Sequence, residues 1–171
     1  MTYLFAADSG AHVSECGMYR WLLWRSWGLG KRLLFIMLNP STADGAEDDP
    51  TIRKCIGFAR RLGFDGIEVV NLYAFRATKP KDLMDVLPVL GEDGDADGMI
   101  LDAARRADTI ICAWGAQARK IPWRAQAVLT QLRENGHAKK LHALRLLADG
   151  TPEHPLMLPY SCGLVPLEVL A

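Results

Sequence analysis

Residues Leu33–Leu72, LLFIMLNPSTADGAEDDPTIRKCIGFARRLGFDGIEVVNL, contain one complete strand–helix–strand unit. The apolar runs Leu33–Leu38 and Ile67–Leu72 predict strands buried on both faces, because apolar residues continue without regular alternation. Between them, Asp49-Pro50 places a capping residue before a proline, which predicts the start of a helix. We expect that helix to run to about Leu62.

The rest of the chain repeats this alternation of strands and helices. The run Thr109–Ala113 predicts a third strand, and Leu141–Leu147 predicts a fourth, although its spacing also suits a helix. Further helices are expected over 96–107 and from 122 to about 135. This order is typical of right-handed crossovers in a parallel sheet. We therefore expect an α/β fold, a three-layer α/β/α domain around a central, mainly parallel four-stranded sheet.

The length of 171 residues fits a single domain that covers residues 1–171. Half of the chain is hydrophobic and 23% is charged, which is a globular composition. Residues 1–30 contain Trp21, Trp24 and Trp27, and we expect them to form a helical segment that packs on the α/β core.

Charge and cysteine usage limit the partners and the compartment. Twenty Lys and Arg balance twenty Asp and Glu, which argues against coating nucleic acid or an anionic membrane by bulk electrostatics. No apolar run reaches the roughly 18 residues of a membrane helix, and residues 1–10 carry no basic region typical of a secretory signal. Four widely spaced cysteines indicate reduced thiols. We expect a cytoplasmic protein with no membrane partner.

Polar and aromatic residues follow each expected strand, at the edge where parallel sheets bind their ligands. These candidate binding residues are Asn39, Pro40, Ser41 and Thr42 after the first strand, Asn71, Tyr73, Phe75 and Arg76 after the second, Trp114 and Gly115 after the third, and His154 and Pro155 after the fourth.

Three of these side chains have a plausible chemical role and a plausible structural one. Asn39 precedes a proline that favours an extended backbone, so its amide either orients a water or ligand, or caps its own turn. Asn71 offers donors and an acceptor that suit the edge of a nucleobase, or it bonds neighbouring backbone. His154 can stabilise developing negative charge or act as an acid or base, or it is incidental.

The acidic loop with Asp44, Glu47, Asp48 and Asp49 raises the possibility of a Mg²⁺ site, although Asp49 already serves as a helix cap. The sequence has no zinc spacing, phosphate-binding loop, dinucleotide fingerprint or serine-hydrolase elbow. A nucleoside triphosphatase, a dinucleotide oxidoreductase and a serine hydrolase are therefore disfavoured.

Three motifs carry a resemblance to a known family. They are LNPSTAD with DDPTIR at 38–53, CAWG at 112–115 and HPLML at 154–158. With them the chain resembles the bacterial and phage family called domain of unknown function 1643 (DUF1643). That family has no assigned activity.

The order of the strand ends also resembles the uracil-DNA glycosylase superfamily. The resemblance implies that Asn39-Pro40 positions a water, that Asn71 reads the base, and that His154-Pro155 stabilises the leaving base; Trp114-Gly115 matches the end of the third strand. The chain departs from that pattern because Met37-Leu38 replace a glycine-rich start, and Ser41-Thr42-Ala43 replace a stacking aromatic residue.

The leading hypothesis is a glycosylase-like enzyme that hydrolyses the N-glycosidic bond of an unusual or modified base in DNA or a nucleoside. Asn39 orients the water, Tyr73 or Phe75 stacks on the base, and Asp44 or Asp48 supplies a base; no cofactor or metal is required. The first alternative is a noncatalytic module that binds nucleotides or nucleic acid. The second is a carboxylate-metal phosphohydrolase that uses the loop from Asp44 to Asp49.

Overall fold

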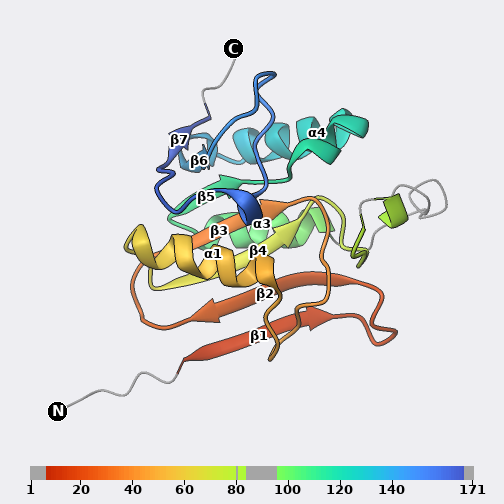
Figure 1. Cartoon of the computed structure of the whole chain (residues 1–171), viewed down its shortest axis with the longest axis vertical. Coiled ribbons are helices and arrows are strands. Elements are labelled where there is room, and N and C mark those ends of the chain that lie inside the picture. Colours follow the sequence, from red (N-terminus) through yellow and green to blue (C-terminus); the bar gives the residue numbers. More distant parts are fainter. Residues whose placement is uncertain (1–6, 80, 84–95, 168–171) are drawn as a thin grey trace.

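The computed structural model describes residues 7–79, 81–83 and 96–167, which form a seven-stranded sheet in the order β1-β2-β4-β3-β5-β6-β7 (Figure 1). The strands are β1 (Asp8–Val13), β2 (Arg20–Ser26), β3 (Arg32–Met37), β4 (Gly66–Asn71), β5 (Thr109–Cys112), β6 (Leu141–Ala143) and β7 (Val165–Pro166).

The centre of the sheet is parallel and its edges are antiparallel. Strands β4, β3, β5 and β6 pair in parallel, as the sequence predicts. Strands β1 and β2 add to one edge and β7 to the other, all antiparallel. The mixed α/β class is therefore confirmed, and the predicted four-stranded sheet is wrong because three antiparallel strands extend it.

The expected tryptophan-rich helix is also wrong, because the described part of residues 1–30 forms strands β1 and β2. The tryptophans recur every three residues, which suits a helix, but Leu22 and Leu23 face opposite sides of the sheet and join different cores. Aromatic residues also favour strands.

Helices pack on both faces of the sheet (Figure 1). Helix α1 (Pro50–Arg61) contributes Ile52, Cys55 and Phe58 to one core. Helices α3 (Ala96–Arg106) and α4 (Pro122–Glu134) contribute to the core on the opposite face. None of the helices in the described ranges is long and apolar enough to span a bilayer.

Strand and helix boundaries follow the sequence closely near the centre of the fold. The Asp49 side chain accepts a hydrogen bond from the Ile52 backbone N–H at 2.9 Å, which confirms the predicted start of α1. The first three predicted strands are each reproduced to within one residue at either end. Only Leu141–Ala143 of the fourth forms a strand, which excludes its helical alternative.

Candidate functional site

A cavity of about 480 Å³ lies at the carboxyl ends of β3, β4 and β5. Its volume is in the range of small-molecule pockets. We call it the strand-end cavity. Of the residues expected at this edge, it is lined by Asn39, Pro40, Ser41, Thr42, Asn71, Trp114, Gly115 and His154.

The other candidates lie outside this cavity lining, which does not include Asp44, Tyr73, Phe75, Arg76 or Pro155. The Asp44 carboxylate accepts the backbone N–H groups of Glu47 and Ala46, and these bonds hold its pKa below the usual range. Phe75 packs edge-on against Tyr19, and Tyr73 lies beneath the Arg124 guanidinium. Pro155 begins a short 3₁₀ turn, η3 (Pro155–Met157).

The side-chain amide of Asn39 is hydrogen-bonded to two backbone carbonyl groups. Its Nδ2 donates to the carbonyls of Pro40, at 3.1 Å, and Ala77, at 2.7 Å. No hydrogen bond reaches its Oδ1 from the described residues, so the oxygen can still accept one. The amide therefore both ties down its loop and offers a fixed acceptor at the cavity.

Asn71 is the last residue of β4 and is only 4% exposed. Within the described ranges, neither its Oδ1 nor its Nδ2 has a hydrogen-bond partner. The alternative of bonding neighbouring backbone is therefore not seen. A buried amide left unpaired costs about 1–3 kcal/mol, so Asn71 has a donor and an acceptor left for a group that enters the cavity.

His154 is oriented as a neutral donor. Its Nδ1 accepts the Leu156 backbone N–H at 3.2 Å, so the proton of the neutral ring lies on Nε2. Burial lowers the pKa of His154, and the nearby charge of Asp49 only partly opposes this shift. The imidazole is therefore neutral near pH 7 and can donate through Nε2.

Gly115 allows the His154 loop to approach the end of β5. Its φ is +82°, a conformation that other residues rarely adopt. A Cβ atom at this position would lie 3.0 Å from the His154 Cβ. The Gly115 N–H donates to the Pro152 carbonyl at 3.0 Å, which fixes the two segments together.

Two charged residues of the lining, Arg20 and Asp49, are absent from the sequence-based candidates for this pocket. Arg20 is 2% exposed, and its Nη1 donates to the Ala43 carbonyl at 2.9 Å. Burial lowers the pKa of Arg20 to about 10, with the charge of Asp49 opposing the shift. Arg20 lies in a segment that the sequence predicted to be helical, whereas Asp49 was predicted to be a helix cap and a possible Mg²⁺ ligand but not a residue of this pocket.

Three arginines from β2 and from the segment after β4 hold the β3–α1 loop, residues 38–49, by its backbone. Arg76 donates to the carbonyls of Ser41 and Thr42, each at 3.0 Å. Arg20 holds the carbonyl of Ala43. Arg25 donates to the carbonyls of Asp44, at 2.6 Å, and Glu47, at 3.4 Å. The loop side chains at the cavity are thus displayed on a fixed backbone.

The acidic residues of this loop do not converge. Asp44 closes a turn, Asp48 pairs with Arg25 at 2.9 Å, and Asp49 caps α1. Across residues 7–79, 81–83 and 96–167, no group of three or more His, Cys, Asp or Glu side chains could hold a metal ion. The arrangement gives no support to the carboxylate-metal alternative.

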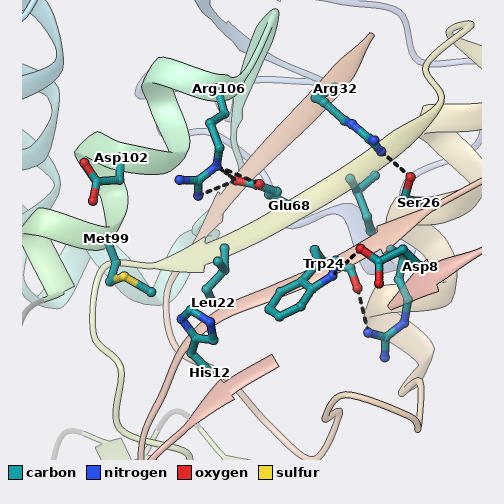
Figure 2. A pocket seen from close by; sticks show the side chains of 12 residues that line it. Asp8, His12, Leu22, Trp24, Ser26, Arg32, Glu68, Met99, Asp102 and Arg106 are labelled. Atoms are coloured by element: carbon teal, nitrogen blue, oxygen red, sulfur yellow. Dashed lines mark hydrogen bonds and ion pairs between the residues drawn. The ribbon is translucent and has the colours of Figure 1, made fainter. Parts of the chain in front are cut away.

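A second cavity, of about 550 Å³, lies between α3 and the strands β1, β2 and β4. We call it the sheet-face cavity. Figure 2 shows several of its polar side chains bonded to one another; for example, Glu68 accepts from Arg106 at 2.9 Å, and Asp8 accepts from the Trp24 indole at 3.1 Å. No side-chain nitrogen or oxygen at this described cavity is buried without a partner.

Comparison with known proteins supports one of the two resemblances. No curated protein and no solved structure matches the chain. The likeness to uracil-DNA glycosylases therefore rests on the motif order alone. A family model described as "Protein of unknown function (DUF1643)" matches residues 20–156. This range includes the residues that line the strand-end cavity. The chain belongs to the DUF1643 family.

Proposed function

We propose that this protein is a glycosylase-like enzyme that hydrolyses the N-glycosidic bond of an unusual or modified base, in DNA or a nucleoside. The observation that carries the proposal is the Asn71 amide, buried and unpaired at the strand-end cavity. A nucleobase edge supplies the adjacent donor and acceptor that this amide lacks.

The remaining polar groups suit the chemistry of the reaction. Asn39 Oδ1 accepts a hydrogen bond from the attacking water and so orients it toward the sugar C1′. Asp49 is the carboxylate among the described lining residues, and it takes the proton of that water. It replaces Asp44 and Asp48 in this role, because their carboxylates are held by other partners outside the cavity.

Bond breaking leaves the electron pair of the C1′–N bond on the departing base. His154 Nε2–H donates to that base as its negative charge develops, and a neutral imidazole is the form suited to this. Trp114 is buried and lines the cavity, so it takes the stacking role that the sequence suggested for Tyr73 or Phe75.

The test is the formation of alkali-labile abasic sites in oligonucleotides that carry deaminated, oxidised or phage-type modified bases. Wild type is expected to cleave one substrate class, and Asn39→Ala and Asn71→Leu are expected to abolish product. Glu68→Gln, in the sheet-face cavity, is the matched control and should retain activity. Product with wild type that persists in Asn71→Leu would contradict the assigned site.

A negative result has a defined meaning. If no substrate yields abasic sites but one of them binds, and Asn71→Leu removes that binding, the noncatalytic binding module replaces the enzyme. Chelator treatment runs beside these samples, and activity lost to the chelator would favour metal-assisted chemistry instead.

A further inference from the structure

Arg20 lines the strand-end cavity and has an unused edge on its guanidinium group. Its Nη1 is engaged by the Ala43 carbonyl, but its buried Nε has no hydrogen-bond partner. Among the described residues, no hydrogen bond reaches Nη2 either. Nε and Nη2 together form the edge of a guanidinium that makes two parallel hydrogen bonds to a carboxylate or phosphate.

The positive charge of Arg20, like part of its hydrogen-bonding capacity, has no direct partner among the described residues. Arg25, which is also buried, forms an ion pair with Asp48 at 2.9 Å. Arg20 makes no such ion pair within the described parts of the chain. Asp49 is close enough for its charge to affect Arg20, but it does not pair with it. Burying a cation without a direct anionic partner is costly, and an oxyanion on a ligand removes that cost.

The start of helix α1 is not the anion site. Asp49 caps its first turn by accepting the Ile52 N–H, and its negative charge lies at that helix end. A ligand oxyanion is therefore drawn to the Arg20 side of the cavity rather than to the helix. The two binding groups come from adjacent strands, since β2 pairs with β4 and Asn71 ends β4.

The other lining side chains narrow the shape of the ligand. Met37, Leu38, Ile52 and Trp114 contribute apolar surface around the two polar groups. A flat heterocycle fits such a lining, and a cyclic amide within it meets both atoms of the Asn71 side chain.

We infer that the strand-end cavity takes a nucleoside-type ligand bearing an oxyanion, either a carboxylate on the base or a phosphate. Arg20 binds the oxyanion through Nε and Nη2, while Asn71 binds the amide edge of the base. The inference rests on the proposed function and adds the charge of the substrate to it.

Calorimetric titration of the full chain with three probes tests this inference. The probes are 2′-deoxyuridine, 5-carboxy-2′-deoxyuridine and 2′-deoxyuridine 5′-phosphate, which share one cyclic amide and differ in charge. We expect one of the two charged probes to bind about tenfold or more tightly than the neutral one. The preferred probe identifies the source of the oxyanion. Equal affinities for all three, or no binding of any, would overturn the inference.

Three variants test whether Arg20 causes the preference. Arg20→Met keeps an unbranched apolar side chain that reaches about as far as the arginine Nε and removes the charge, so the affinities should become equal. Arg76→Met is the matched control, because Arg76 holds carbonyls of the same loop from outside the cavity lining. It should retain the ratio of affinities. A preference that survives in Arg20→Met overturns the inference.

Arg20→Lys keeps the proposal testable if Arg20→Met does not fold. Lysine retains the positive charge but lacks the two parallel donors. We expect it to lose most of the preference, and an unchanged preference would contradict binding through the guanidinium edge.

Release of free base from the same three probes, measured by chromatography, separates the proposed enzyme activity from the inferred oxyanion binding. A charge preference, with no base released from these probes and no abasic sites in the oligonucleotide assay, supports this inference and removes the enzyme. Base release without a charge preference supports the enzyme and removes this inference.

Discussion

Polar side chains of the sheet-face cavity hold one another, whereas those of the strand-end cavity keep unmet hydrogen-bonding groups. Glu68 and Arg106 form an ion pair in the first, while Asn71 and Arg20 are buried with unpaired atoms in the second. The sheet-face cavity is nevertheless the larger, at about 550 Å³ against about 480 Å³. The comparison supports placing the proposed site at the strand-end cavity, because the unmet hydrogen bonds of Asn71 and Arg20 favour it although its volume does not.

The most demanding test of this contrast is Asn71→Leu. Leucine removes the unpaired amide from the strand-end cavity, so ligand binding should fall about 100-fold and product formation should be abolished. The free energy of unfolding should rise by about 1 kcal/mol, because a buried polar group without a partner is removed. Chemical denaturation and the abasic-site assay measure the two effects. An Asn71→Leu variant that is less stable than wild type and fully active would contradict the assignment of the site to the strand-end cavity.

The Gly115→Ala substitution tests the shape of the strand-end cavity. Its φ of +82° and the 3.0 Å approach to the His154 Cβ predict a loss of about 1–2 kcal/mol in the free energy of unfolding. Displacement of His154 should also reduce product formation. Gly163→Ala is the control, since a Cβ atom there has no neighbour within 4 Å. Thermal unfolding of the two variants checks the prediction, which fails if they behave alike.

The pH dependence of stability separates His154 from a histidine away from both cavities. Burial lowers the pKa of His154 and of His137, so each folded-state pKa lies below the ordinary value of about 6.5. The unfolded chain then binds protons more readily. The stability from each neutral histidine is complete above about pH 6.5 and is lost as the pH falls toward the folded-state pKa.

Thermal unfolding between about pH 7.5 and 5 measures this loss. Both His154→Gln and His137→Gln should flatten the acid side of the stability profile. Only His154→Gln should also change the pH profile of product formation, because His137 is not among the residues that line the strand-end cavity. An identical activity profile in the two variants would remove His154 from the site.

The smallest effect is expected in the sheet-face cavity. Glu68→Gln weakens a partly exposed ion pair with Arg106, and such pairs contribute about 0.2–1 kcal/mol. The loss should shrink further at high salt. Denaturation at two salt concentrations measures it, with product formation unchanged. A large loss of activity in Glu68→Gln would place the function in the sheet-face cavity and contradict the assigned site.

Local patterns in the sequence predicted the centre of the sheet and eight of the residues that line the strand-end cavity. Parallel strands are continuous apolar runs, and the residues after them meet at one edge, so Asn39, Asn71 and His154 could be placed before the structure was known. The cap at Asp49 was equally local. Such features depend on residues close together in the chain.

The features of the site that the sequence did not predict depend on residues that are far apart in the chain. Arg20 reaches the cavity only because β2 pairs with β4, and the spacing of tryptophans in that segment imitates a helix. Tyr73 and Phe75 follow the correct strand but pack against Arg124 and Tyr19 instead. Side-chain direction after a strand end is set by tertiary packing, which one sequence does not reveal.

Because three arginines hold the β3–α1 loop by its backbone, the side chains of this loop can change while its anchoring contacts remain. The guanidinium groups of Arg20, Arg25 and Arg76 contact carbonyl oxygens, which every amino acid carries. Replacing Ser41 or Thr42 therefore leaves the anchor points intact while altering what the loop shows to a ligand. Arginines far away in the sequence thus set the path of the loop backbone, while the loop residues set which side chains face the cavity, so those side chains can be exchanged without changing the backbone path.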